Sequence, residues 1–243
     1  ITQLSAPIAA ASVAQVHQAV HAETGEMLAV KILRPNIELR LASELALLAR
    51  LAKMAEKYFP VTRRLRPVDS IEILARSING ETDLRMEAAA LSEMAENIGD
   101  MKGFRVPSLY WEASGRRVLT MQWVDGVKAS NVDALRAAGH DLSDLAVRLL
   151  QIFLTLVLRD GFFHADMHPG NMFVDADGVL SPVDFGIMGR LDQKTQNFLA
   201  DMLIAFLNRD YQKVADVHFA AGYVPANKSP GAFSQACRAD RQP

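Results

Sequence analysis

The sequence contains a single cysteine, Cys237, and no long hydrophobic run. One cysteine excludes an internal disulfide framework and is typical of a reducing compartment. The longest apolar run spans residues 152–158, which is far short of the roughly 20 residues that a transmembrane helix needs. The beginning of the chain also lacks the pattern of a signal peptide. These absences argue against a membrane span within the sequence and against a secreted, disulfide-bonded fold.

An excess of charge of one sign is lacking as well. The chain carries 26 Lys and Arg residues against 28 Asp and Glu residues, a formal net charge of −2. This balance argues against a nucleic-acid-binding protein. Hydrophobic residues make up 50% of the 243 residues. A chain of this length and composition can bury a substantial core in one large or two small domains.

The most informative stretch reads His-Ala-Asp-Met-His-Pro-Gly-Asn over residues 164–171 and is followed by Asp-Phe-Gly at residues 184–186. Between these motifs, residues 172–174 and 179–183 are apolar and are joined by the turn sequence Asp-Ala-Asp-Gly. Two short apolar runs around such a turn predict a hairpin. The hairpin would bring polar side chains from its two ends to a single mouth.

The residues at that mouth are Asp166, Asn171 and Asp184. Phosphoryl transfer needs such a trio, in which one Asp receives or orients the proton of the nucleophile. The Asn and the second Asp hold Mg²⁺ against the nucleotide phosphates. A polar loop would explain any one of these residues. The complete spacing favours Asp166 as the catalytic residue and Asn171 and Asp184 as metal ligands.

Lys31 lies inside an apolar run, residues 27–33, that predicts a strand ending before Pro35. A charge within an apolar strand is costly unless it is paired. Taken alone, Lys31 is more simply explained as an edge-strand lysine that faces water. Together with the two motifs above, it is predicted to pair with the α- and β-phosphates of a nucleotide and with a glutamate on a helix.

The segment before this strand is rich in alanine where a phosphate-covering loop is usually rich in glycine. Glycine lets the backbone approach the phosphates, whereas Cβ atoms restrict the backbone. Helix propensity alone favours the start of a helix here, but the position directly before the lysine strand favours a modified nucleotide-binding loop. Its residues are Ile8, Ala9, Ala10, Ala11, Ser12, Val13, Ala14, Gln15 and Val16.

Two helical segments follow the lysine strand. Residues 38–58 show apolar side chains at helical spacing, and residues 70–97 form a second segment that the sequence interrupts at Asn79-Gly80. The short basic linker at residues 63–67 separates them and is most simply a solvated turn. A contact of this linker with a membrane or a partner has no support from the sequence.

The second segment carries Glu-Thr-Asp-Leu-Arg-Met-Glu at residues 81–87. An ordinary charged surface helix could have the same composition. The functional interpretation pairs Glu87 with Lys31 and turns Glu81 and Asp83 toward the site. Glu81 remains the alternative partner of Lys31.

Residues 105–123 predict two strands around Ser114-Gly115, followed by a crossing from a β-rich lobe to a helical lobe. The backbone near Gln122 and Val124 would contact the edge of an adenine, although a plain strand-to-turn transition has the same pattern. The predicted domains are an N-terminal lobe of residues 1–123 and a C-terminal lobe of residues 124–243. Helices are expected in the second lobe at residues 142–159, 192–208 and 211–220.

Taken together, these residues resemble the UbiB family of atypical kinases, which is linked to ubiquinone biosynthesis. The resemblance is dense and covers nearly the whole chain. It rests on the alanine loop at 9–17, Val-Lys-Ile-Leu-Arg-Pro at 30–35, Glu-Thr-Asp at 81–83 with Glu87, and the motifs at 162–171 and 184–186. Residues 208–211, 214–215 and 224–225 also look like the family's C-terminal half.

The resemblance implies an α+β, bilobal protein-kinase-like fold with a small β-rich N-lobe, extra helices and a mainly helical C-lobe. It also implies an enzyme, an atypical kinase or ATPase, that binds ATP and Mg²⁺ and supports ubiquinone biosynthesis. Its implied partners are quinone-synthesis enzymes, or a lipid or quinone precursor, at the cytoplasmic face of the bacterial inner membrane. The family's Lys-x-Gly-Gln stretch and C-terminal apolar helices are not found, which predicts that the chain is a fragment.

Three departures from ordinary protein kinases bear on the substrate. Ala165 stands where an Arg would grip a phosphorylated activation loop, so regulation by such phosphorylation is not expected. His168 stands where many protein kinases hold a Lys near the γ-phosphate. Few residues separate Gly186 from the next predicted helix, and no Ala-Pro-Glu triplet follows. These features argue against a peptide substrate.

Two further functions remain open from the sequence. A small-molecule phosphotransferase of the aminoglycoside or choline type would carry a similar catalytic loop, although the alanine loop and the Glu-Thr-Asp triplet favour the UbiB family. A non-catalytic, nucleotide-gated scaffold for quinone-synthesis enzymes is the other alternative, against which the intact Asp166, Asn171 and Asp184 argue.

Overall fold

A computed structural model describes residues 1–10, 13–99, 101–225 and 227–239. The chain divides into two compact units. The first contains residues 1–140 and 167–186, and the second contains residues 141–166 and 187–243. Both units therefore combine segments that are separated in the sequence. This division differs from the predicted boundary between residues 123 and 124, and the two-lobe division stays a prediction.

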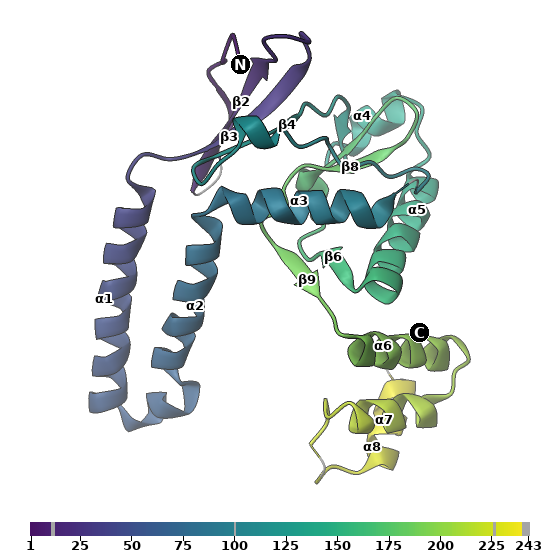
Figure 1. Cartoon of the computed structure of the whole chain (residues 1–243). Helices are drawn as coiled ribbons and strands as arrows, with labels where there is room; N and C mark the ends of the chain where they lie inside the picture. Colours follow the sequence, from purple (N-terminus) through teal and green to yellow (C-terminus); the bar gives the residue numbers. More distant parts are fainter. Residues whose placement is uncertain (11–12, 100, 226, 240–243) are drawn as a thin grey trace. The chain divides into compact units, whose positions relative to one another are not determined.

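The first unit is built on a four-stranded antiparallel sheet with the order β1-β2-β3-β4 (Figure 1). The strands are β1 (Pro7–Ala10), β2 (Ala14–Val20), β3 (Met27–Leu33) and β4 (Val118–Gln122). The tight connection after β2 ends at Glu26, whose carbonyl accepts a hydrogen bond from the N–H of His21 (2.8 Å). Strand β3 therefore occupies a central position, with β2 and β4 on its two sides.

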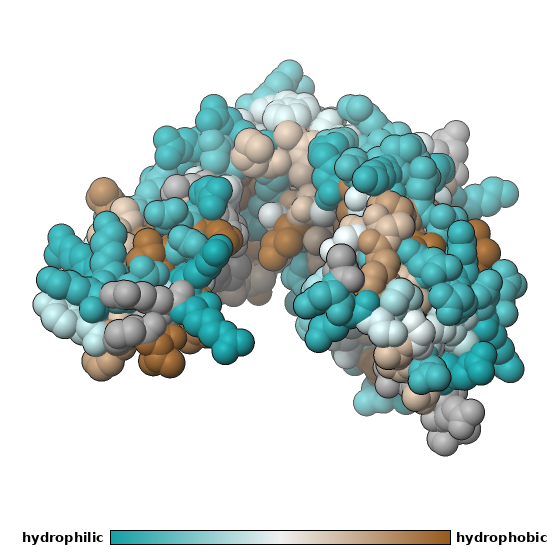
Figure 2. Space-filling view, turned by 90° about the horizontal axis from the view of Figure 1, so that it is seen from below, coloured by the Kyte–Doolittle hydropathy of each residue, from teal (hydrophilic) through white to brown (hydrophobic). Residues whose placement is uncertain are grey.

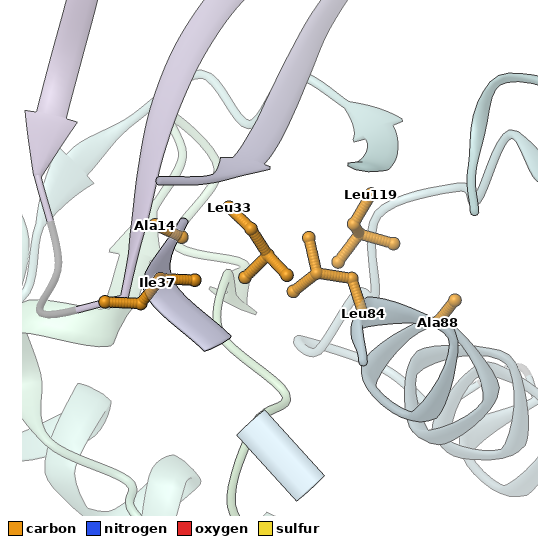
Figure 3. Close-up of a cluster of buried hydrophobic side chains, with 6 residues drawn as sticks. All are labelled: Ala14, Leu33, Ile37, Leu84, Ala88 and Leu119. Carbon is orange, nitrogen blue, oxygen red and sulfur yellow. The ribbon is translucent and has the colours of Figure 1, made fainter. Parts of the chain in front are cut away.

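The two faces of β3 bury different groups because successive side chains of a strand alternate. Leu28 and Val30 belong to a hydrophobic cluster with Ala19 on one face. Leu33 lies on the other face, toward helix α3 (Leu84–Ile98) (Figure 3). Lys31 is two residues before Leu33 and so shares that face. Lys31 is therefore turned toward α3 by the pleat of the strand.

A second hydrophobic cluster fixes α3 to this face of the sheet (Figure 3). Leu84 and Ala88, on successive turns of the helix, meet Leu33 of β3 and Leu119 of β4. All four side chains are nearly inaccessible to water. The cluster is completed by Ala14 and Ile37. It determines the position of the helix relative to the strand that carries Lys31.

Two helices are inserted between β3 and α3. Helices α1 (Ile37–Tyr58) and α2 (Pro67–Glu81) lie side by side and are joined by the 3-10 helix η1 (Pro60–Leu65) (Figure 1). The predicted interruption at Asn79-Gly80 is instead found after Glu81, where Asp83 caps α3 by accepting a hydrogen bond from the N–H of Arg85 (3.1 Å). A capping Asp satisfies one of the free N–H groups of a new helix and so determines where that helix begins.

The remainder of the first unit contains a smaller sheet with the order β5-β7-β8. The predicted hairpin is present as strands β7 and β8, and it ends beside η4. The elements are η2 (Trp111–Ala113), β5 (Val127–Lys128), α4 (Val132–Ala137), η4 (Pro169–Asn171), β7 (Met172–Val174) and β8 (Leu180–Pro182).

The prediction of two strands within residues 105–123 is wrong in part. Only β4 forms a strand of several residues there, while Leu109 and Gly115 make isolated bridges to Met121 and Val118. The intervening residues form η2, whose end is bonded by the Ser114 hydroxyl to the carbonyl of Tyr110 (2.7 Å). This local bonding competes with a continuous ladder of backbone hydrogen bonds.

The second unit is mainly helical. The helix predicted at residues 142–159 is α-helical only as far as Thr155, and a π-helical turn follows it. The only sheet among its described residues has two strands. The elements are α5 (Leu142–Thr155), η3 (Leu156–Asp160), β6 (Phe162–His164), β9 (Met188–Arg190), α6 (Gln193–Leu207), α7 (Tyr211–Ala220) and α8 (Pro230–Ala239).

We expect Leu119→Ala to lower the free energy of unfolding by roughly 2–5 kcal/mol, because it would leave a cavity in the cluster that fixes α3 to the sheet. Leu39→Ala, at a side chain that is 73% exposed, is the matched control and should change stability little. Urea unfolding of both variants measures the effect. Equal losses at the two positions would contradict this account of the cluster.

Candidate active site

The centre of the candidate site is a buried ion pair between Lys31 and Glu87. The Lys31 ammonium lies 2.8 Å from Oε1 and 2.9 Å from Oε2 of Glu87. Lys31 is 9% exposed and Glu87 is 6% exposed. Glu87 directly precedes Ala88 on the face of α3 that the hydrophobic cluster holds against the sheet. The packing of α3 thus brings together two residues that are 56 positions apart in the sequence.

Asp184 joins this pair. Its Oδ1 lies 3.2 Å from the Lys31 ammonium and accepts a further hydrogen bond from the N–H of Gly186 (3.1 Å). Phe185, which is 1% exposed, donates its backbone N–H to Oε1 of Glu87 (3.3 Å). The Asp-Phe-Gly segment is therefore bonded to both members of the ion pair. Lys31 consequently contacts two carboxylates, those of Glu87 and Asp184.

The three charges shift one another's pKa values. Burial of the Lys31 ammonium favours its neutral form, but the carboxylates of Glu87 and Asp184 outweigh this effect and raise the pKa of Lys31. Burial raises the pKa of Glu87, and the Lys31 charge opposes this only in part. Burial also acts to raise the pKa of Asp184, yet Lys31 and the Gly186 N–H prevail and lower it. Asp184 is therefore ionised at neutral pH.

Asn171 and Asp184 lie at the same end of the β7–β8 hairpin. In this hairpin Met172 pairs with Pro182, and the carbonyl of Asn171 accepts a hydrogen bond from the N–H of Val183 (3.0 Å). Asp184 directly follows that bond. Its side chain remains 40% exposed although it is paired with Lys31. The hairpin thus brings residues 171 and 184 to the same end, and their role as metal ligands stays a prediction.

These two groups suit Mg²⁺, because that ion prefers oxygen ligands and is commonly held by one or two carboxylates together with substrate phosphates and water. Among the described residues, no three His, Cys, Asp or Glu side chains are grouped as a metal site. A pair of oxygen ligands whose coordination is completed by phosphates and water fits Asn171 and Asp184.

Asp166 belongs to the second unit, whereas Lys31, Glu87, Asn171 and Asp184 belong to the first. The backbone around Asp166 is held by the pairing of β6 with β9 and by a hydrogen bond from the N–H of Ala165 to the carbonyl of Ile187 (3.0 Å). His164, which is buried, accepts a hydrogen bond at Nδ1 from the N–H of Asp166 (3.1 Å). Because Nδ1 accepts, the proton of a neutral His164 resides on Nε2.

Sequence reasoning did not assign a role to His164, and it did not anticipate the direct contact of Lys31 with Asp184. The first could have been inferred from a histidine two residues before the Asp, a spacing that allows a local bond from side chain to backbone. No signal in the sequence indicates the second, because it depends on the relative placement of β3 and the hairpin.

The predicted adenine-contacting segment follows β4. The N–H of Gln122 donates to the carbonyl of Ser108 (2.8 Å), and the N–H of Trp123 donates to the carbonyl of Met27 (3.0 Å). Gln122 and Val124 are half-buried. At Gly126, an added Cβ would lie 2.5 Å from the carbonyl oxygen of Val174, so only glycine fits the turn that follows this segment.

The predicted nucleotide loop corresponds to β1, β2 and their connection. The four residues of β1, including Ile8, Ala9 and Ala10, are exposed, and Val16 on β2 lies opposite Lys31 in the register. Ala14 is fully buried in the cluster beneath α3. Val13, Gln15 and Val16 are half-buried, while Ala11 and Ser12 lie outside the described residues.

The Glu-Thr-Asp triplet does not turn as a group toward the ion pair. Asp83 caps α3 and pairs with Arg85 at 2.6 Å, a hydrogen-bonded contact that lowers the pKa of Asp83 to about 2. Thr82 is buried, and the side chain of Glu81 lies outside the described residues. Glu87 is the glutamate that pairs with Lys31.

The fold and this lysine–glutamate–aspartate cluster define a protein-kinase-like protein. Residues 3–218 match the ABC1 atypical kinase-like domain, and the chain belongs to this family. The match confirms the predicted resemblance to atypical kinases, and the relatives and the solved structure that follow confirm its UbiB type and the α+β kinase-like fold.

Curated relatives carry the name "Probable protein kinase UbiB". The protein from Pseudomonas paraeruginosa is 42% identical over 241 residues, which cover 98% of this chain and 45% of that protein. The protein from Shewanella pealeana is 37% identical, with 98% and 44% covered. The chain thus spans just under half the length of these relatives.

Among solved structures, that of Rv3197 from Mycobacterium tuberculosis in complex with erythromycin superposes with a TM-score of 0.70 at 24% identity, covering 92% of this chain and 56% of that one. At this identity the likeness supports the fold alone. In the part of the chain that the structure describes, no helix has both the length and the apolarity required to cross a membrane.

We expect Lys31→Met to destabilise the protein by roughly 3–5 kcal/mol at pH 7, because it leaves the buried Glu87 carboxylate without its cation. The loss should be smaller at pH 5. Without Lys31, the pKa of Glu87 rises further in the folded state, and a carboxyl group with a raised folded pKa loses stability as the pH rises through that pKa. Urea unfolding at both pH values measures the difference.

Lys102→Met, at an exposed lysine, serves as the control and should have little effect at either pH. The double variant Lys31→Met/Glu87→Gln should depend less on pH than Lys31→Met, since Glu87 no longer titrates and only the more exposed Asp184 is left without its cation. A destabilisation by Lys31→Met that is equal at pH 5 and pH 7 would contradict the assignment to Glu87.

Proposed function

We propose that this chain binds Mg²⁺–ATP and turns it over as an atypical kinase or ATPase. The observation that carries the proposal is the buried Lys31–Glu87 pair with Asp184 at 3.2 Å from the same ammonium. An ionised carboxylate beside a buried, charged lysine is an arrangement that can receive both a metal ion and phosphate oxygens. Family membership supports use of ATP.

In this proposal Lys31 binds the α- and β-phosphates, and Glu87 orients Lys31. Asn171 and Asp184 would hold Mg²⁺, which neutralises charge on the phosphates when bound. Asp166 would orient the nucleophile or accept its proton, with His164 as a positioning residue through the bond to the Asp166 backbone. Catalysis of this kind relies on positioning and charge stabilisation rather than on covalent chemistry.

The nucleotide base would lie against the segment after β4. Because the N–H of Gln122 is bonded to Ser108, a contact with adenine would use the carbonyl of Gln122 and the N–H of Val124. The alanine-rich loop from Ile8 to Val16 would cover the phosphates. Ala14 could contribute only through its backbone, since its side chain is part of the core.

The acceptor of the phosphoryl group is proposed to be a small molecule or water rather than a peptide. Only residues 187–192 separate the Asp-Phe-Gly motif from α6, and three of them form β9. So short a segment leaves little room for a platform that binds a peptide. Ala165 also lacks the cationic side chain that would hold a phosphorylated loop.

The biological role proposed for the whole protein is support of ubiquinone biosynthesis. The proposal rests on family membership and on the names of relatives of which this chain spans less than half. The proposed partners are quinone-synthesis enzymes, or a lipid or quinone precursor, at the cytoplasmic face of the bacterial inner membrane.

We expect Asp184→Asn to abolish Mg²⁺-dependent ATP binding, because it removes the ionised metal ligand. Asp166→Asn should retain ATP binding but lower turnover, by roughly 10²–10⁴-fold. Isothermal titration with and without Mg²⁺, together with phosphate release, measures both quantities. Asp177→Asn, in the exposed turn of the same hairpin, is the matched control and should behave as the unaltered chain. Equal Mg²⁺-dependent binding by Asp184→Asn would refute the site.

In cells, we expect neither Asp166→Asn nor Asp184→Asn to restore ubiquinone levels when introduced into the full-length protein in a deletion strain, because turnover needs both residues. Quinone quantification by liquid chromatography measures rescue, with Asp177→Asn as the control that should rescue. If Asp166→Asn restored quinone levels while Asp184→Asn did not, nucleotide binding rather than turnover would be the function, and the scaffold alternative would be favoured.

A further inference from the structure

The tip of the α1–α2 hairpin differs in charge from the rest of the chain. We define this hairpin tip as residues 50–66, which comprise the end of α1, η1 and the residue before α2. These 17 residues contain six Lys or Arg residues and a single acidic residue, Glu56, whereas the whole chain has a net charge of −2. Positive charge is therefore enriched at the hairpin tip.

Within the tip, the acidic residues are far fewer than the basic ones. Glu56 is half-buried, and one of its carboxylate oxygens accepts a hydrogen bond from the N–H of Val68 (3.3 Å). Arg66 approaches Asp69 only at 3.8 Å, and both side chains are mostly exposed. With six basic residues and one acidic residue, residues 50–66 keep a net positive charge even where Asp69 lies near Arg66.

Large apolar and aromatic side chains are exposed among these basic residues. Val61 is 81% exposed and Leu65 is 75% exposed. Met54, Tyr58 and Phe59 are also more than half exposed. Figure 2 shows brown apolar residues among teal ones at this end of the hairpin, on the left of the view. Packing within the protein does not explain these side chains, because they face water.

We propose that the hairpin tip docks on a membrane surface that contains anionic phospholipid. Apolar and aromatic side chains interleaved with Lys and Arg are typical of segments that insert into the lipid headgroup region. There the basic groups bind anionic headgroups, while Tyr and Phe rings lie at the boundary with the acyl chains. The inference rests on the membrane location proposed above and assigns it a surface. No residue of the nucleotide site takes part, so this surface is separate from the proposed ATP chemistry.

Vesicle sedimentation of the 243-residue chain tests the proposal. Vesicles of phosphatidylglycerol and phosphatidylcholine should bind the chain, and pure phosphatidylcholine should bind it far less. Arg64→Gln/Arg66→Gln should weaken binding to the anionic vesicles roughly 25-fold, about fivefold for each basic residue. Val61→Ser/Leu65→Ser should weaken it on the order of tenfold, since apolar burial is lost. Binding by the unaltered chain should also fall between 0.05 and 0.5 M salt because of screening.

Matched controls lie elsewhere on the surface. Lys102→Gln/Arg136→Gln removes two exposed basic residues outside the tip, and Leu207→Ser removes a side chain that is 79% exposed. Both variants should bind vesicles as the unaltered chain does. Mg²⁺-dependent ATP binding, measured on the same preparations, should be retained by the tip variants. Failure of lipid binding and failure of the nucleotide site therefore appear in separate measurements.

Three results would overturn the proposal. The first is an unaltered chain that binds anionic and neutral vesicles equally or binds neither. The second is a set of tip variants that sediment with anionic vesicles as well as the controls. The third is self-association of the chain, seen by light scattering, that the tip variants abolish without any vesicle binding, since the tip would then contact a second copy of the chain.

Discussion

The buried charge of Lys31 is the constraint on which the first unit depends. An ammonium group that leaves water needs a counter-charge, and a surface carboxylate cannot provide one inside the protein. Glu87 meets this need only when α3 lies against the sheet, and α3 is held there by Leu84 and Ala88. The hydrophobic cluster and the ion pair therefore stabilise the same arrangement. The cluster provides the free energy, and the ion pair selects the rotation of the helix that presents Glu87.

The same pair connects the helix to the Asp-Phe-Gly segment. Glu87 accepts the N–H of Phe185 while it binds Lys31, and Lys31 in turn reaches Asp184. A displacement of α3 would therefore remove the partner of the lysine and of the Phe185 backbone together. Because the remaining carboxylate, Asp184, is the proposed metal ligand, the position of α3 and the electrostatics of the metal site are physically linked.

The sequence predicts those features that depend on local periodicity. The helix at residues 38–58, the helix at 211–220 and the strand at 27–33 are observed within one residue of the predicted bounds, because apolar spacing determines them. The break between the two helices lies at Thr82-Asp83 and not at the predicted Asn79-Gly80, because Asp83 caps the helix that follows. The second strand predicted near residue 110 is not formed, because hydrogen bonds within the turn at Tyr110–Ser114 take the place of a ladder of backbone hydrogen bonds between strands.

In the site, the residue types and their order were predictable, since Lys31, Asn171 and Asp184 follow motif spacing. The contacts between them were not predictable in the same way. That Lys31 touches Asp184 and that Phe185 bonds Glu87 depend on how a strand, a helix and a hairpin pack, and these elements are distant in the sequence. The burial of Ala14 in the core likewise follows from the position of α3, not from the composition of the alanine loop.

The inserted helices α1 and α2 show how the fold can carry the exposed hairpin tip without disturbing the Lys31–Glu87 site. Ile37 at the start of α1 and Leu84 at the start of α3 belong to the same hydrophobic cluster, so both ends of the insertion are anchored at one place. The entropic cost of closing such a loop grows only with the logarithm of its length. Once both ends are fixed, the residues at the far end of the hairpin are free of packing constraints from the ion pair. The exposed apolar and basic side chains at the tip can therefore be suited to a partner surface while Lys31 and Glu87 stay in place.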